Sequence, residues 1–190
     1  MLKKYMLTVM FLFCGIAVVF FAITTNAISG DNFYSNEKWG VKFAVPVGVN
    51  VYTSENPGPM ASRINSETPL WLVSSSLASE RINLKVSQFE DATEKELNET
   101  KQELDSGTLY RSIPQYQKIS VKFIKIGKQG NKNAVEHIHA LKQREPKKLR
   151  QIMFVHRGRF FNFTCATSPE RFDIANSQFF DLIFSSMEFK

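Results

Sequence analysis

The chain has 190 residues, of which 43% are hydrophobic and 22% charged, and its formal net charge at pH 7 is +6. This length and composition are those of one globular domain with a substantial core, and they exclude a disordered or fibrous chain. A net charge this small gives no argument for nucleic-acid binding. The sequence also lacks the Gly-rich, Gly-x-Ser-x-Gly, His-Glu-x-x-His and Cys-x-x-Cys motifs of nucleotide, hydrolase, metalloprotease and redox sites.

The first residues have the pattern of a secretory leader. Lys3 and Lys4 precede an almost entirely apolar run over residues 6–23, and Thr25-Asn26-Ala27 offers small residues where a signal peptidase cleaves. We therefore expect a signal peptide over residues 1–27. The alternative is an uncleaved membrane anchor, since the run approaches the length that spans a bilayer. Both interpretations place the domain outside the cytoplasm.

The next segment begins the domain. Residues 28–37 form a polar lead-in, and we expect one domain over residues 38–190. Apolar alternation predicts a strand at 41–45 and, after a Pro/Gly break, a second at 47–51. Three prolines make residues 56–69 a loop.

A strand–helix unit follows. Residues 70–73 and 82–86 are predicted strands. Thr93 and Glu96 form a capping box, the signature of a helix start. Leu97 then begins a narrow buried stripe on a helix whose other face is charged.

Two further features are predicted in the middle of the chain. Gly107 ends the helix, because glycine adopts the left-handed conformation that closes helices. Ile119, Val121 and Phe123 then alternate as the buried positions of a strand. A shift of phase at Ile124 indicates a β-bulge.

Two hairpins are predicted in series. Residues 134–144 form the first strand, which a turn at 145–148 connects to a strand at 149–156. Arg157-Gly158 then forms a two-residue turn into a strand at 159–166, with glycine where a positive φ is needed.

The C-terminal segment predicts a helix and a last strand. Ser168 is a suitable N-cap, and Pro169 suits the first helical position. A short strand follows at 187–189. One apolar helix face is predicted from the spacing of Phe172, Ala175, Phe179, Leu182 and Ile183.

These elements predict an α+β fold. Hairpin connections favour an antiparallel β-sheet flanked by helices. Nine of the seventeen phenylalanines lie between residues 154 and 189, so we expect the core to be densest there.

Four stretches of the chain carry a family resemblance. They are residues 39–46, Trp-Gly-Val-Lys-Phe-Ala-Val-Pro; the strand and Thr-capped helix of residues 82–97; the strand entry from Ile126-Gly127 through 134–139; and the closing strand and helix of residues 160–189. In these four places the chain resembles the PsbP-like family, which includes bacterial DcrB-type envelope proteins and a nuclear Ran-binding protein. The resemblance implies an α/β/α sandwich, and it implies a non-enzymatic role, because members serve as accessory subunits, envelope proteins or small-GTPase partners.

Three histidines form the one candidate metal site. If the turn at 145–148 pairs Arg144 with Leu149, the constant sum of partner numbers in an antiparallel pair places His137 opposite His156. His139 then shares their face, close enough to hold zinc or copper. A register slip of one residue would move His156 to the other face. Inert histidines of a half-buried strand are the alternative.

Cys165 is the one cysteine beyond the leader. The same counting across Arg157-Gly158 places Cys165 opposite Arg150, roughly 20 Å from His156 at the usual rise per residue. This separation disfavours a Cys/His nucleophile, and we expect a buried thiol.

Basic residues surround the first hairpin turn. Lys142, Arg144, Lys147, Lys148 and Arg150 form a candidate docking site for an anionic partner, either lipid headgroups, a polyanion or an acidic protein. The alternative is a solvated turn that charge keeps soluble.

The sequence as a whole favours a non-catalytic, extracytoplasmic binding or accessory protein, periplasmic or secreted. We expect a protein partner at the membrane, no nucleic acid and no small-molecule substrate. The rival function is a metal-binding protein that uses the three histidines.

Overall fold

The computed structural model describes residues 32–74, 81–86, 91–110, 113 and 115–190, and of residues 81–86 it describes the backbone. The predicted signal peptide lies outside the described residues, and so does the choice between its cleavage and its retention. Within the described ranges, no helix has both the length and the apolar character needed to cross a membrane.

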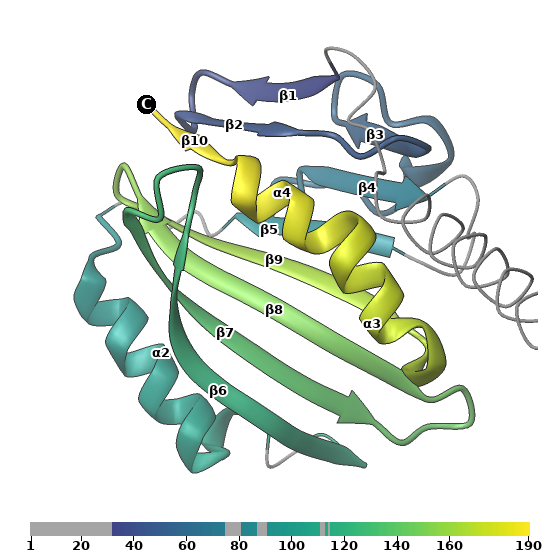
Figure 1. Cartoon of the computed structure of the whole chain (residues 1–190), viewed down its shortest axis with the longest axis vertical. Helices are drawn as coiled ribbons and strands as arrows, with labels where there is room; N and C mark the ends of the chain where they lie inside the picture. The colour runs from purple at the N-terminus through teal and green to yellow at the C-terminus, as the bar shows by residue number, and fades with distance from the viewer. Residues whose placement is uncertain (1–31, 75–80, 87–90, 111–112, 114) are drawn as a thin grey trace, which may run out of the picture. The chain divides into compact units, whose positions relative to one another are not determined.

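A seven-stranded antiparallel sheet forms the centre of the fold (Figure 1). This arrangement confirms the predicted antiparallel α+β fold. In spatial order the strands are β3 (Val49–Thr53), β4 (Leu70–Ser74), β5 (Arg81–Val86), β9 (Arg159–Thr167), β8 (Lys147–His156), β7 (Lys132–Leu141) and β6 (Tyr116–Ile126).

A second, three-stranded sheet has the order β1-β2-β10. Its strands β2 (Val41–Ala44) and β10 (Glu188–Phe189) correspond to predicted strands. The third strand, β1 (Phe33–Asn36), pairs antiparallel with β2 and lies inside the segment that we expected to be a polar lead-in. That expectation was wrong for these four residues, because a strand this short shows too little alternation to be recognised.

Helix α2 (Glu94–Ser106) begins and ends as its sequence predicts. The Thr93 backbone N–H donates to Glu96 Oε2 at 2.7 Å, and the Thr93 side chain accepts from the Lys95 amide at 3.2 Å. Gly107 closes the helix with φ of 72°. Leu97 and Leu104 are fully buried, so the narrow stripe is the face that packs on the sheet.

The C-terminal helix contains an unpredicted π-helical turn. It runs through η3 (Pro169–Arg171), α3 (Phe172–Ala175), the π turn η4 (Asn176–Phe180) and α4 (Asp181–Ser186). In the π turn the Asp181 amide donates to Asn176 O, five residues back, which rotates the following residues relative to an α-helix.

This rotation changes the buried face of the helix. Phe172, Ala175, Phe179 and Ile183 are buried as predicted. Phe180 and Phe184 are also buried. Leu182, which the α-helical spacing placed on the buried face, is half-buried.

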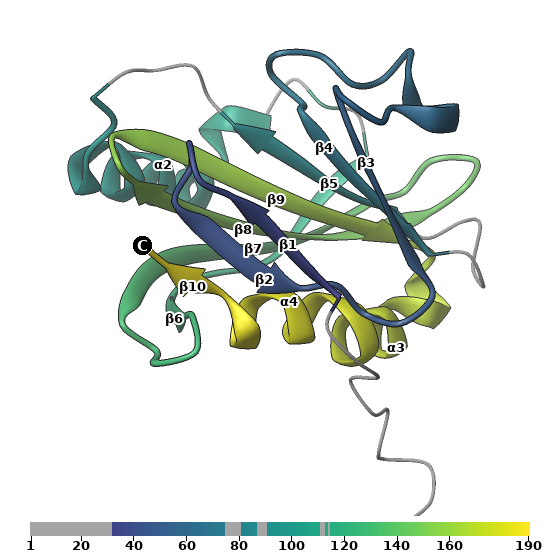
Figure 2. The ribbon, with the colours of Figure 1, turned by 90° about the horizontal axis from the view of Figure 1, so that it is seen from above.

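The central sheet is covered on both faces. Figure 2 shows α2 on one side of the sheet and α3 and α4 on the other. One core cluster lies on the α3–α4 side and includes Phe43, Phe154, Phe161 and Phe163, and the other lies beneath α2 and includes Leu97. The arrangement is the predicted sandwich, and the phenylalanines of the C-terminal segment form much of its larger core.

The edge strand β6 differs from its prediction in two ways. Its bulge lies between Lys118 and Ser120 instead of near Ile124. Ile119 is 49% exposed and Phe123 51% exposed, although the alternation placed both among the buried positions.

Candidate binding surface

The register of the β7–β8 hairpin separates the three histidines. Leu141 pairs with Lys147 across the turn, so His137 lies opposite Gln151. The expected register, with Arg144 opposite Leu149, was therefore wrong by five residues. Because an odd shift reverses the face of every side chain, His156 lies on the opposite face of the sheet.

Two histidines remain together beneath α2. The rings of His137 and His139 stack with their centroids 4.4 Å apart, and both side chains are buried. Tyr110 and Tyr116, themselves stacked at 4.5 Å, lie against them. The structure thus brings together His137 and His139 with two tyrosines, and not with His156.

Both ring nitrogens of His137 are hydrogen-bonded within the domain. Gln151 Oε1 lies 2.9 Å from His137 Nδ1 and also accepts from the Tyr110 hydroxyl at 2.9 Å. Because a carbonyl oxygen only accepts, Nδ1 carries the proton, and Nε2 accepts from the Tyr116 hydroxyl at 2.9 Å. These bonds leave His137 no lone pair for a metal ion, and no cluster of metal-binding side chains occurs within the described ranges.

Burial keeps these histidines neutral. Burial, together with the neighbouring His137, lowers the pKa of His139 from 6.5 to about 4. The pKa of His137 is lowered mainly by burial, and burial also lowers the pKa of His156, whose ring contacts Phe189 at 5.2 Å. All three are therefore predominantly neutral at pH 7.

Cys165 has the predicted environment. It lies opposite Arg150 in the β8–β9 pair, in the expected register, and its side chain is buried in the larger core. It does not share a face with His137 or His139.

The basic hairpin divides into exposed and internally paired residues. Lys142 and Arg144 are exposed, and Lys147 is half-buried. Lys148 Nζ lies 4.0 Å from the centroid of the Phe172 ring, so this lysine packs against the C-terminal helix. Arg150 belongs to an ion-pair network inside the domain. The sequence predicted that Arg150 would face a docking partner, but these ion pairs occupy its side chain.

That network connects the sheet to α4. Arg150 Nη2 lies 2.8 Å from Oε1 of Glu136, and its Nη1 binds Asp181. The Glu136 carboxylate is almost completely buried, and Lys122 Nζ lies 2.9 Å from its Oε2. Sequence reasoning missed Glu136, although a lone acid within the apolar run of a central strand was a usable signal.

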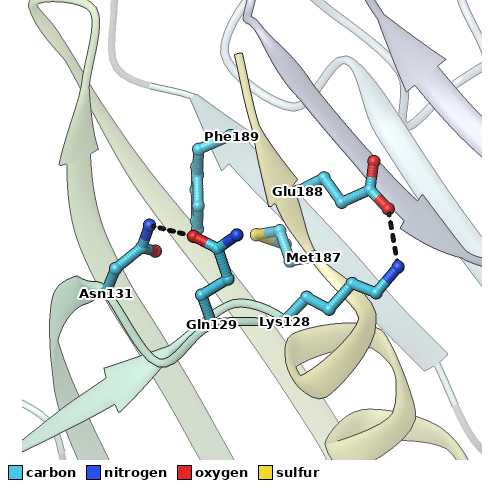
Figure 3. Close-up of a pocket in the computed structure, with 6 residues that line it drawn as sticks. All are labelled: Lys128, Gln129, Asn131, Met187, Glu188 and Phe189. Carbon is cyan, nitrogen blue, oxygen red and sulfur yellow. Dashed lines mark hydrogen bonds and ion pairs between the residues drawn. The ribbon is translucent and has the colours of Figure 1, made fainter.

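A polar pocket lies at the N-terminal end of β7, between the β6–β7 turn and β10 (Figure 3). Its volume is about 520 Å³. Lys128 Nζ lies 3.5 Å from Glu188 Oε1, and Asn131 donates to Gln129 Oε1 at 3.3 Å. The sequence predicted none of its lining residues as site residues. Those that the structure describes are Lys128, Gln129, Asn131, Met187, Glu188 and Phe189.

The pocket has the chemistry of a binding surface. Its lining side chains donate and accept hydrogen bonds around an apolar floor that includes the buried Met187. Among the described residues that line it, the one carboxylate, Glu188, is paired with Lys128. The pocket can therefore hold a polar group.

Comparison with known proteins identifies the fold. No family model matches the chain, and no curated protein matches it. Among solved structures, cyanobacterial PsbP (CyanoP) from Synechocystis sp. PCC 6803 matches with a TM-score of 0.60 and 16% identity, over 89% of this chain and 99% of that chain. A Bacteroides thetaiotaomicron protein matches with a TM-score of 0.57 and 7% identity, over 84% of this chain and 48% of the other.

A third structure, LpqN of Mycobacterium tuberculosis, is described as involved in cell envelope biogenesis. It matches with a TM-score of 0.53 and 11% identity, over 77% of this chain and 81% of that chain. The predicted resemblance is thereby confirmed at the level of the fold: the chain has the PsbP-like fold.

Proposed function

We propose that this protein is a non-catalytic binding or accessory protein that acts outside the cytoplasm with a protein complex at a membrane. The observation that carries this proposal is the exposed basic turn between β7 and β8. Lys142, Arg144 and Lys147 lie on or beside this turn, and none of their side chains has an ion-pair partner within the described ranges. A surface that leaves its cations without partners suits an acidic partner surface.

The chemistry of the buried polar residues supports a role without catalysis. His137 uses both ring nitrogens for hydrogen bonds within the domain, and His139 is held neutral by burial. Arg150 and Glu136 neutralise each other. These side chains stabilise the fold and leave recognition to the exposed turn and the polar pocket.

The leader and the similar structures support the location. Residues 1–27 have the pattern of a signal peptide. LpqN, which shares the fold, is described as involved in cell envelope biogenesis. The proposal follows from these two observations taken together, since a fold alone does not define a function.

Crosslinking in intact cells tests the proposal. A photoreactive amino acid replaces Gln143, which is exposed within the basic turn, and a second variant carries it at Glu99, which is exposed on α2. We expect a membrane-associated protein to be captured from position 143 and not from position 99. Capture of the same protein from both positions, or of none from position 143, contradicts the proposal.

Charge reversal adds a matched control. Replacing Lys142, Arg144 and Lys147 by glutamate is expected to reduce the captured product at least tenfold, because the complementary charges become repulsive. The control reverses three exposed cations elsewhere, Lys38, Arg63 and Lys95, and is expected to leave capture unchanged. Equal capture by both triple variants contradicts an electrostatic role for the turn.

A further inference from the structure

Strand β6 forms one edge of the large sheet. It pairs with β7 on one side, and within the described part of the chain no strand pairs with its other side (Figure 1). With 11 residues it is long for an edge strand. An edge of this length presents a row of unpaired backbone groups, onto which another strand can add.

The hairpin register shows which backbone groups face outward. His156 and Arg159 flank the two-residue turn and therefore form a hydrogen-bonded pair. Because hydrogen-bonded pairs alternate along each ladder, the Lys122–Glu136 pair is hydrogen-bonded too. The neighbours of Lys122 direct their N–H and C=O groups away from β7. This outward-facing set is Val121, Phe123 and Lys125.

Apolar side chains accompany this backbone edge. Phe123 is 51% exposed and Ile119 is 49% exposed, two of the largest exposures of apolar side chains within the described ranges. Phe123 flanks α2, where Lys101 Nζ lies 5.4 Å from its ring centroid. A strand added to β6 would remove part of this apolar surface from water.

The charge around the edge is strongly biased. Residues 116–150 contain ten Lys and Arg residues and two acids, whereas the remainder of residues 31–190 contains twelve basic and sixteen acidic residues. The exposed lysines Lys118, Lys122 and Lys125 lie along β6 itself. This part of the sheet therefore carries the positive charge of an otherwise acidic domain.

We propose that the outer edge of β6, from Ile119 to Lys125, pairs with an extended acidic segment of a partner protein, which adds to the sheet as a further strand. This inference rests on the proposed binding function and specifies the form of the partner. Backbone hydrogen bonds supply the pairing, Ile119 and Phe123 contact apolar side chains of the added strand, and the lysines select for acidic ones.

The lysines and the bulge also disfavour pairing of this edge with a second copy of itself. Lysines on an edge strand repel another strand of the same charge, and a bulge interrupts regular pairing. The same charges attract an acidic strand. They therefore select acidic partner strands over basic ones.

Peptide binding tests the inference directly. The probe is a nine-residue peptide of alternating glutamate and valine with blocked ends, and the control probe replaces each glutamate by lysine. Amide hydrogen exchange of the purified protein is measured with each peptide. We expect the acidic peptide to slow exchange at Val121, Phe123 and Lys125 at least tenfold, less so at high salt, and the basic peptide to have no effect. Protection confined to other strands overturns the proposal.

A matched pair of variants tests the backbone contribution. Phe123→Pro removes an outward-facing amide, which an edge strand tolerates, whereas Phe123→Ala removes the same ring and keeps the amide. We expect the proline variant to bind the acidic peptide at least tenfold more weakly than the alanine variant. Equal affinities overturn the proposal. Circular dichroism checks that both variants are folded. If the proline variant is unfolded, the double charge reversal K118E/K125E replaces it, and this variant is also expected to weaken binding tenfold.

The two proposals can fail separately. If crosslinking from position 143 captures its partner but the acidic peptide does not bind β6, the strand-addition inference is wrong and the binding function stands. If the peptide protects β6 but no partner is captured in cells, the edge binds acidic strands and the proposed accessory function is wrong.

Discussion

The guanidinium of Arg157 binds the backbone carbonyl of Lys190, with Nε donating at 3.1 Å. Its Nη1 donates to the carbonyl of Glu37 at 3.0 Å. The β8–β9 turn is therefore bonded to both the N-terminal and the C-terminal segments of the three-stranded sheet. Gly40 makes this possible, because a Cβ atom there would lie 2.6 Å from Arg157 Nε.

Gly40→Ala is expected to destabilise the domain more than Gly107→Ala. Both glycines have positive φ, 64° and 72°, so each alanine costs about 1–2 kcal/mol of backbone strain. Among the described residues, none has an atom within 4 Å of a Cβ at Gly107. At Gly40 the new methyl group also displaces Arg157 and breaks its two hydrogen bonds, which costs about 1 kcal/mol more. Urea denaturation measures both. In the background of Arg157→Ala the difference between the two glycine variants is expected to disappear, and its persistence would contradict this explanation.

Arg150→Ala is expected to cost about 3 kcal/mol of unfolding free energy, because it leaves the buried Glu136 carboxylate without its main partner. Lys122→Ala is the control. The Lys122 side chain is 60% exposed, so loss of its ion pair with Glu136 should cost less than about 1 kcal/mol. Thermal and urea denaturation compare the two variants. Equal losses would show that the network does not depend on burial.

Phe180→Ala is expected to cost about 3–5 kcal/mol, and Leu182→Ala under about 2 kcal/mol. The Phe180 side chain is fully buried, with its ring 4.8 Å from that of Phe184, whereas Leu182 is half-buried. The comparison tests the π turn, since an uninterrupted α-helix would give Leu182 a larger share of the buried face. The reverse order of stabilities in urea denaturation would contradict the π turn.

Local signals predicted the elements whose causes are local. Thr93 and Glu96 lie three residues apart and satisfy each other's backbone groups, so the start of α2 is visible in a short window. Arg157 and Gly158 both have positive φ, as a two-residue hairpin turn of type I′ requires, and the β8–β9 register followed from that turn.

The β7–β8 register was not predictable in the same way. Residues 152–155 are buried on both faces of the sheet, because α2 covers one face and the C-terminal helix covers the other. Alternation of apolar and polar residues, the signal that defines the phase of a strand, is absent from such a strand. Without that signal the length of the turn is undetermined, and the predicted three-histidine site was wrong because the observed register places His156 on the other face of the sheet.

The candidate surfaces show the same division between local and long-range information. The basic turn was visible as a run of lysine and arginine, but the pairing of Arg150 with Asp181 joins residues 31 positions apart. The polar pocket combines the β6–β7 turn with β10, and the outward edge of β6 follows from its place at the end of the sheet. Sequence periodicity carries no information on either.

His139→Phe is expected to make the domain less sensitive to acid. The pKa of His139 is about 4 in the folded protein and 6.5 in the unfolded chain, so the unfolded chain binds the extra proton between these values. Stability contributed by the neutral ring is present above pH 6.5 and is lost as the pH falls from 6.5 towards 4, by up to about 1 kcal/mol per pH unit. The phenylalanine variant lacks this pH-dependent contribution. At pH 7 its stability should be within about 1 kcal/mol of that of the natural protein, because His139 Nδ1 has no hydrogen-bond partner among the described residues. Urea denaturation at pH 7, 6, 5 and 4.5 compares the natural protein with His139→Phe. The control variant is His137→Phe, which loses two hydrogen bonds and is therefore expected to be destabilised already at pH 7. Parallel stability curves for the natural protein and His139→Phe would show that His139 is not the acid-sensitive residue.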